Sequence, residues 1–362
     1  MRSYPFAATY DSTPLVVQKR DGTWLVLAHE HENARTVAMN RDSAQVDWVS
    51  ESNQPGNLFF GYSYFVQPDS SKLIFLACIN GLHAMSSESG QEVWWHRCRG
   101  TGGVTPCVDQ ANGWTYYQCD GKLFKLSAAT GDVLATVDVS EPHQCVSWNT
   151  VLVNDDYGDF VATYWHGAPQ WDSAIRVYDQ DLKTVWEKTG LPIGRKATLT
   201  YTDGKLIAGC GNHWDANYSG DEWKHVTAYE VQTGDTAWQC DLPLAARQYI
   251  ANVPYLNGCL YAESQSFDST TPSQLFRINA ANGTLQETLT YRHGICSCAP
   301  SIIAHGMLLS GDVFGDHVIA TRIAENSDCC WPGPFGDPQN NQMAAVKRRA
   351  AGKAVAMQEV GR

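Results

Sequence analysis

Short apolar runs alternate with polar turns along most of this chain. The segments "LTYTDGKLIAGC" at 199–210 and "VPYLNGCLYAE" at 253–263 each contain two apolar runs separated by Asp-Gly or Asn-Gly. These dipeptides adopt the positive φ angles that a two-residue β-hairpin requires. The pattern therefore predicts pairs of short antiparallel strands rather than helices.

A second pattern recurs along the chain: a strand, a turn of small or acidic residues, a Gly, and then an apolar residue. It reads "SSESGQEVWW" at 86–95, "LSAATGDVLA" at 126–135, "YEVQTGDTAW" at 229–238 and "INAANGTLQE" at 278–287. We expect the Gly to turn the chain between a third and a fourth strand, and the large apolar residue to anchor the unit against its neighbour. The predicted anchors are Trp48, Trp94, Leu134, Trp186, Trp238 and a residue at about Leu285.

Together the two patterns define a repeat of four short antiparallel strands. We place its copies at 12–54, 55–100, 101–142, 143–191, 192–244, 245–293 and 294–325. Four-stranded units repeated around an axis form a β-propeller. The prediction is an all-β, seven-bladed β-propeller over residues 1–331. Residues 332–362 form a C-terminal tail. We expect it to begin as a loop and, where it becomes rich in Ala, Lys and Arg, to continue as a short helix or a loose tail.

Composition narrows the function classes. The net charge of −12 argues against nucleic acid as a partner, because nucleic-acid-binding domains usually carry a basic excess. No apolar run reaches the length of a membrane span. The first residues lack the charged start and apolar core of a signal peptide, so either the protein is intracellular or a leader is missing from this sequence. We expect a monomer that is secreted or periplasmic.

Candidate ligand-binding residues fall in the segments that a propeller gathers on one face. These segments are the linkers between units and the loops between the second and third strands. Nine residues there are basic, imidazole or phenol side chains: His143, Tyr164, His166, Arg195, Lys196, His213, Tyr218, Arg247 and Tyr249. A cationic, aromatic patch on an acidic protein favours an anionic ligand with a ring-shaped face, such as a uronic-acid polysaccharide.

A cysteine–histidine cluster lies late in the chain. "YRHGICSC" supplies His293, Cys296 and Cys298, and "DCCWPG" supplies Cys329 and Cys330. Such ligands suit a closed, structural zinc site that would pin the end of the chain to the last unit. A disulfide and buried free thiols are the alternatives.

The repeated "A-A-T-G" and "T-G-x-x-x-W" patterns resemble the PQQ-like propeller repeat. With the histidine pair His143 and His166 and the late cluster, the chain also resembles the ulvan lyase families of polysaccharide lyases. That resemblance implies β-elimination on a uronate polymer. Arg195, or else Arg247, would hold the uronate carboxylate. His143 and His166 would transfer protons from and to the sugar. It also implies a mouth tyrosine, for which Tyr249 and Tyr218 are better placed than Tyr178, and a structural zinc.

Two other functions compete with the lyase interpretation. The quinoprotein dehydrogenases carry an adjacent cysteine pair inside the propeller, whereas this pair follows the last unit, so we expect no PQQ. The alternative function is a non-catalytic scaffold that docks proteins. A scaffold would need no histidine pair and would show an exposed apolar groove.

Overall fold

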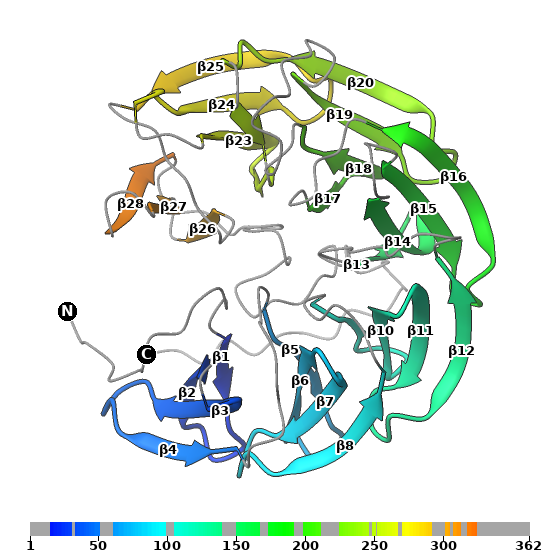
Figure 1. The fold of residues 1–362 in the computed structure, drawn as a ribbon, viewed down its shortest axis with the longest axis vertical. Helices are drawn as coiled ribbons and strands as arrows, with labels where there is room; N and C mark the ends of the chain where they lie inside the picture. Colours follow the sequence, from blue (N-terminus) through cyan, green and yellow to red (C-terminus); the bar gives the residue numbers. More distant parts are fainter. Residues whose placement is uncertain are drawn as a thin grey trace, which may run out of the picture.

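The computed structural model describes residues 15–30, 33–50, 61–98, 105–139, 150–166, 173–191, 198–210, 224–245, 248–250, 252–266, 270–291, 301–304, 307–312 and 317–323. Within these ranges the chain contains strands and turns and no helix. The strands form seven antiparallel sheets, one for each predicted unit, and we number them as blades 1–7 in chain order. Figure 1 shows the blades around a ring, with β13, β17 and β26 towards the centre and β4, β8, β12, β16 and β25 on the periphery.

Each blade is a simple meander of consecutive strands. Blades 1–3 comprise β1 (Leu15–Gln18), β2 (Trp24–Glu30), β3 (Arg35–Asn40) and β4 (Val46–Val49); β5 (Ser63–Val66), β6 (Lys72–Cys78), β7 (Gly81–Ser86) and β8 (Glu92–Arg97); and β9 (Cys107–Asp109), β10 (Trp114–Cys119), β11 (Lys122–Ser127) and β12 (Val133–Asp138). Blades 4 and 5 comprise β13 (Thr150–Asp155), β14 (Gly158–His166), β15 (Ser173–Asp179) and β16 (Thr184–Leu191); and β17 (Leu199–Thr202), β18 (Lys205–Ala208), β19 (His225–Glu230) and β20 (Thr236–Asp241).

The last two blades depart from the four-strand pattern. Blade 6 comprises β21 (Gln248–Ile250), β22 (Tyr255–Leu256), β23 (Cys259–Ser266), β24 (Gln274–Asn279) and β25 (Leu285–Thr290), and both β21 and β22 pair with β23. Blade 7 comprises β26 (Ile302–Ala304), β27 (Met307–Asp312) and β28 (His317–Arg322), so its described residues form three strands. The predicted propeller of four-stranded antiparallel blades is confirmed.

The hydrophobic core lies between the blades. Successive residues of a strand point to opposite faces of its sheet, so each blade packs against both neighbours. On β6, Ile74 packs with blade 1 and Phe75 packs with blade 3. In the described residues, six buried clusters fill the interfaces from blades 1 and 2 to blades 6 and 7. Burial on both faces explains why the inner strands are almost continuously apolar.

At four of these interfaces, a tryptophan of one blade packs against a glycine of the next. The indole Nε1 of Trp94 donates to the Ala128 carbonyl, 3.2 Å away, in the next blade. A Cβ built on Gly131 would lie 2.7 Å from ring atoms of Trp94, so a glycine is needed there for the ring to approach. The other pairs are Trp48 with Gly90, Trp186 with Gly234, and Trp238 with Gly283. The predicted packing of these tryptophans on the neighbouring blade is confirmed.

The interface between blades 3 and 4 has no tryptophan–glycine contact and packs differently. Strand pairing places Ala135, not Leu134, at the position that Trp94 holds in blade 2. The predicted anchor Leu134 is therefore wrong by one residue, and its side chain is 50% exposed. In the facing turn Leu182 takes the left-handed conformation (φ 61°) and joins the buried cluster against which Ala135 packs. Lys125 Nζ donates to the Gln180 carbonyl at 2.9 Å, which replaces the indole donor.

Strand pairing also corrects the anchor of blade 6. Arg277 pairs with Glu287, as Ala84 pairs with Trp94, so the anchor position predicted at about Leu285 is Glu287. A small side chain meets a large one between blades 3 and 4, whereas a large side chain meets glycine at the four tryptophan interfaces.

Candidate functional site on the loop face

All long connections lie on one face of the ring. Because the strands of a blade alternate in direction, the turns that join its first strand to its second and its third to its fourth share one face, which we call the hairpin face. On that face no connection in blades 1–7 as described is longer than five residues, as in 19–23. The opposite face, which we call the loop face, receives the longer segments, including 139–149, 192–198, 209–224 and 291–301. Candidate ligand-binding residues are therefore sought on the loop face.

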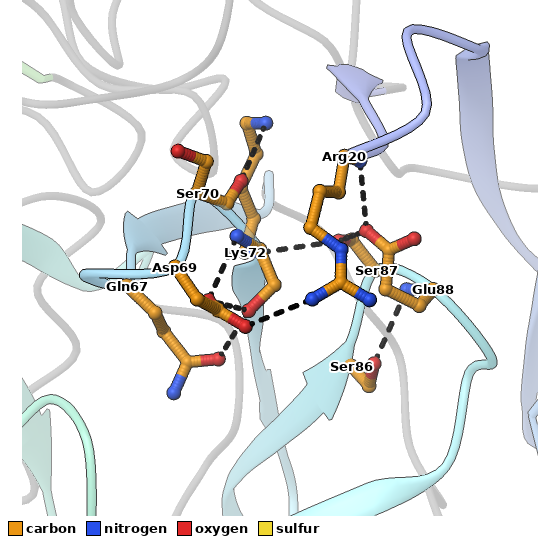
Figure 2. Close-up of polar contacts among 9 residues, drawn as sticks. Arg20, Gln67, Asp69, Ser70, Lys72, Ser86, Ser87 and Glu88 are labelled. Carbon is orange, nitrogen blue, oxygen red and sulfur yellow. Dashed lines mark hydrogen bonds and ion pairs between the residues drawn. The ribbon is translucent and has the colours of Figure 1, made fainter.

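The hairpin face is held together by polar contacts between its turns. Figure 2 shows Arg20, in the turn after β1, reaching two acidic residues of blade 2. Its backbone N–H donates to Glu88 Oε1 at 3.0 Å, and its Nη1 lies 3.2 Å from Asp69 Oδ2. Lys72 Nζ also donates to the Gln18 carbonyl. Arg20 and Asp69 are more than half exposed, so this pair contributes at most about 1 kcal/mol. The contacts join blades 1 and 2.

Most predicted site residues lie outside the described residues. This holds for six of the mouth residues and for all five predicted zinc ligands: His143, Arg195, Lys196, His213, Tyr218, Arg247, His293, Cys296, Cys298, Cys329 and Cys330. His166 is the last residue of β14, at its loop-face end, and its side chain is not among those described.

Two predicted tyrosines are described, and both are buried. Tyr164 has no exposed surface and packs in the cluster between blades 4 and 5. Tyr249 is 2% exposed, and its hydroxyl donates to Gln265 Oε1 at 2.7 Å across the β21–β23 pair. In this structure neither ring offers surface to a ligand. Tyr178, the third candidate, is also buried, and burial raises its pKa.

A layer of buried polar side chains lies at the loop-face end of blade 6. Gln248 Nε2 donates to the Pro272 carbonyl at 2.8 Å, and Gln248 Oε1 accepts from the Ala245 backbone N–H at 2.9 Å. Gln274 N–H donates to Ser264 Oγ at 2.7 Å. Blades 3 and 4 share a similar contact, since Gln118 lies 3.4 Å from Thr150 Oγ1. These hydrogen bonds fix the strand ends from which the loop-face segments start.

A buried carboxyl group lies between blades 6 and 7. Glu263 is 3% exposed and accepts hydrogen bonds from Ser301 Oγ at 2.6 Å, Ser310 Oγ at 2.8 Å and Tyr291 O–H at 3.0 Å. Burial raises the pKa of Glu263, and the three hydroxyl donors oppose the shift. This group could not be predicted from the sequence, because Glu263 follows an apolar strand pattern and two of its partners, Ser301 and Ser310, come from the next blade.

Blade 2 contains a second polar cluster that sequence reasoning missed. The buried His83 contacts Glu92 Oε2 through Nδ1 at 2.6 Å and Asn80 Oδ1 through Nε2 at 2.9 Å. The Trp95 ring stacks on the imidazole, with centroids 4.9 Å apart, and Arg97 lies over Trp95. Burial lowers the pKa of His83, and the Glu92 carboxylate opposes that shift. Both imidazole nitrogens already have hydrogen-bond partners, so we interpret the cluster as one that stabilises blade 2.

The cysteines fall into two groups. A disulfide joins Cys98, after β8, to Cys119, at the end of β10, and so connects blades 2 and 3. Among the described cysteines, Cys78, Cys107, Cys210 and Cys240 are free and buried, where a thiol acts as a small apolar side chain, and Cys259 is free and partly buried. Burial raises the pKa of the Cys240 thiol to about 11. In the described part of the chain no group of three or more His, Cys, Asp or Glu could hold a metal ion.

Comparison with known proteins supports the fold. No family model matches the sequence, and no curated protein is similar to it. Among solved structures, BamB from Moraxella catarrhalis superposes with a TM-score of 0.55 at 13% identity, covering 86% of this chain and 84% of that one. A Kuenenia stuttgartiensis hydrazine synthase chain gives 0.58 at 10% identity (89% and 99% covered), and a chain of the mitotic checkpoint complex gives 0.58 at 11% identity (89% and 90% covered).

At these identities the likenesses show the fold alone, a β-propeller. Among the described residues no helix is both long and apolar enough to cross a membrane.

Proposed function

We propose that the loop face binds an anionic, uronic-acid-containing polysaccharide and cleaves it by β-elimination. The observation that carries the proposal is the asymmetry of the two faces, because all long connections of blades 4–6 start from one end of the strands. His143 belongs to the segment between β12 and β13, and Arg195 to the segment between β16 and β17. His166 ends β14 at the same face.

The buried polar side chains at the loop-face end of blade 6 support the proposal indirectly. Gln248, Gln265 and Ser264 are hydrogen-bonded to neighbouring strands and connections. These bonds fix the strand ends from which the loop-face segments start, and a fixed starting point lowers the conformational entropy that a binding segment loses.

The proposed chemistry needs a cation and a proton acceptor on one side of the sugar. Arg195 would neutralise the uronate carboxylate, which stabilises the charge that develops when the C5 proton leaves. One neutral histidine of the pair His143 and His166 would take that proton, and the other would protonate the departing C4 oxygen. We leave Tyr164 and Tyr249 out of this chemistry because both are buried, so Tyr218 is the tyrosine assigned to the mouth. The route consumes no redox cofactor.

Absorbance of the unsaturated uronate product tests the proposal directly. Purified protein is incubated with ulvan and with other uronate polymers, and the product band is followed over time. We expect a rise on at least one polymer, which is lost in His143→Ala and in Arg195→Ala. The matched control is His225→Ala, which removes a histidine of β19 that takes no part in the proposed chemistry. A flat trace on every polymer would overturn the lyase assignment.

A protein-docking scaffold is the second candidate, and one observation favours it. The outer strands of blades 2, 3 and 4 expose apolar side chains at equivalent positions: Val93 is 51% exposed, Leu134 50% and Val185 43%. Such positions on an outer strand suit contact with another protein. If the protein is a scaffold, Leu134→Asp should abolish binding of an identified partner reconstituted from purified components, whereas His143→Ala should leave that binding intact.

A further inference from the structure

Four asparagine–glycine dipeptides occur in the chain, and all four lie within the described residues. They are Asn80-Gly81, Asn112-Gly113, Asn257-Gly258 and Asn282-Gly283. An asparagine that precedes glycine can lose its side-chain amide spontaneously, because glycine has no Cβ to hinder its own backbone nitrogen. The four copies share one reactive sequence, so their surroundings decide which of them reacts in the folded protein.

The reaction is the hydrolysis of one side-chain amide through a cyclic intermediate. Solvent hydroxide takes the proton of the glycine N–H, and the nitrogen bonds to the asparagine Cγ. The Cγ–Nδ2 bond breaks, and the nitrogen takes up a proton from water and leaves as ammonia. Water then opens the five-membered succinimide at either carbonyl, which gives aspartate or isoaspartate. The glycine N–H and the asparagine side chain must therefore both be free to move.

At Asn282 both reacting groups are already hydrogen-bonded. The Gly283 N–H donates to the Asn279 carbonyl at 2.9 Å, and Asn282 Oδ1 accepts from the Thr284 N–H at 3.1 Å. Gly283 is also buried, against the ring of Trp238. These bonds must break before the nitrogen can attack, so the folded state protects this asparagine.

Asn112 is held by a single neighbouring acid. Its Nδ2 donates to Asp109 Oδ2 at 2.7 Å, and the Gly113 N–H donates to the Asp109 carbonyl at 2.9 Å. Both groups that would have to move are therefore fixed to the same residue.

Asn80 is fixed through its side chain and its backbone. Its Oδ1 contacts His83 Nε2 at 2.9 Å, and its carbonyl accepts from Trp95 Nε1 at 3.2 Å. Gly81 is buried, and it pairs with residues on both neighbouring strands. Water and hydroxide therefore have little access to its N–H.

Asn257 has none of this protection. With Gly258 it forms the two-residue turn between β22 and β23, which the Leu256–Cys259 pair closes. Both turn residues are exposed, and among the described residues neither the Asn257 side chain nor the Gly258 N–H has a hydrogen-bond partner. A Cβ built on Gly258 would meet no atom within 4 Å, so the succinimide ring has room to form.

We propose that Asn257 is the residue at which the folded protein first deamidates, and that isoaspartate accumulates there. The aspartate product fits the turn, because the equivalent turn of blade 5 holds Asp203-Gly204 with φ angles of 44° and 76°, close to the 49° and 79° of Asn257 and Gly258. Isoaspartate instead routes the main chain through its side chain and adds a carbon to the loop. The Leu256–Cys259 pair then no longer closes a two-residue turn. Since β22 has only two residues, deamidation loosens the start of β23.

Peptide mapping of the full-length protein by mass spectrometry tests the proposal. The protein is incubated in mildly alkaline buffer, either folded or in urea, until all four peptides of the urea sample contain converted asparagine. Conversion is measured as the mass change from amide to acid, and isoaspartate as the converted fraction that endoproteinase Asp-N does not cleave. Asn257→Gln is the test variant, because glutamine would need a six-membered ring. Asn112→Gln, in the corresponding turn of blade 3, is the matched control.

In the folded protein we expect the Asn257 peptide to convert about tenfold or more faster than the other three, because those must first break hydrogen bonds. In urea the four rates should converge. Asn257→Gln should remove the fast conversion, whereas Asn112→Gln should leave it unchanged. Equal rates at the four sites of the folded protein overturn the proposal, as does an Asn257 peptide that keeps its amide or yields aspartate alone. None of these outcomes bears on the proposed lyase activity, which is measured separately.

Discussion

At the residue scale, the turn glycines combine a backbone requirement with a packing requirement. Gly131 has φ +76°, and a Cβ there would collide with Trp94. Gly131→Ala should therefore incur about 1–2 kcal/mol for the left-handed backbone and a further 1–3 kcal/mol for overpacking. The measurement is the free energy of unfolding from urea titration. Gly258→Ala is the matched control, because Gly258 has φ +79° and no neighbouring atom within 4 Å. This variant should therefore be destabilised only by the left-handed backbone and not by overpacking.

A double-mutant cycle isolates the ring contact. Trp94→Ala removes the ring and should destabilise the protein by about 3–5 kcal/mol. In that background Gly131→Ala should cost no more than Gly258→Ala does, because the Cβ no longer meets an indole. Equal costs for Gly131→Ala with and without Trp94 would show that the glycine serves the backbone only.

The buried Glu263 predicts a specific dependence of stability on pH. Its pKa is raised above the reference value of 4.5 by burial, so the native state holds the proton more tightly than the unfolded chain. The stabilisation is complete below pH 4.5 and is lost as the pH rises through the raised native pKa. Glu263→Gln should remove this loss, so its unfolding free energy should fall less than that of the wild type over the same pH range. Parallel curves for the two proteins would contradict the assignment.

At the element scale, the Cys98–Cys119 disulfide ties blade 2 to blade 3. The two cysteines are separated by 21 residues, so the bond should stabilise the protein by about 3 kcal/mol through the unfolded chain. Adding a reductant should lower the urea midpoint of the wild type. The Cys98→Ser/Cys119→Ser variant should already show the lower midpoint and should not respond to reductant. A reductant effect of equal size in that variant would place the sensitive bond elsewhere.

The elements themselves were predictable from sequence, because hairpin dipeptides and turn glycines act locally. Asp203-Gly204 and Asn257-Gly258 adopt the positive φ angles expected of them. The anchors of blades 3 and 6 were missed because the anchor position holds Ala135 and Glu287 there instead of a tryptophan, so a nearby leucine fitted the apolar pattern better. The disulfide and the Glu263 network depend on contacts between blades, which no single repeat encodes.

At the scale of the whole molecule, the hairpin face carries an excess of negative charge. The hairpin-face turns have more acidic than basic residues: Asp21, Asp42, Asp69, Glu88, Asp132, Asp156, Asp181, Asp203 and Asp235 against Lys19, Arg20, Arg41 and Lys183. An acidic hairpin face repels a polyanion at long range, whereas the arginines and histidines proposed for the loop face attract it at short range. Because the repulsion acts over a longer range than the attraction, added salt screens the repulsion first.

The activity on a uronate polymer should therefore pass through a maximum as salt increases. At 0.01 M the Debye length is about 30 Å and the whole charge of −12 repels the polymer, whereas at 0.1 M it is about 10 Å and only nearby charges act. The apparent KM should fall between these salt concentrations and rise again towards 1 M, as the arginine contacts are screened. Asp132→Asn/Asp156→Asn/Asp203→Asn, which lowers the charge of the hairpin face, should reduce the low-salt deficit and leave the high-salt limb unchanged. A KM that rises steadily from the lowest salt in both proteins would mean that the polymer responds to the loop face alone, and the long-range argument would fail.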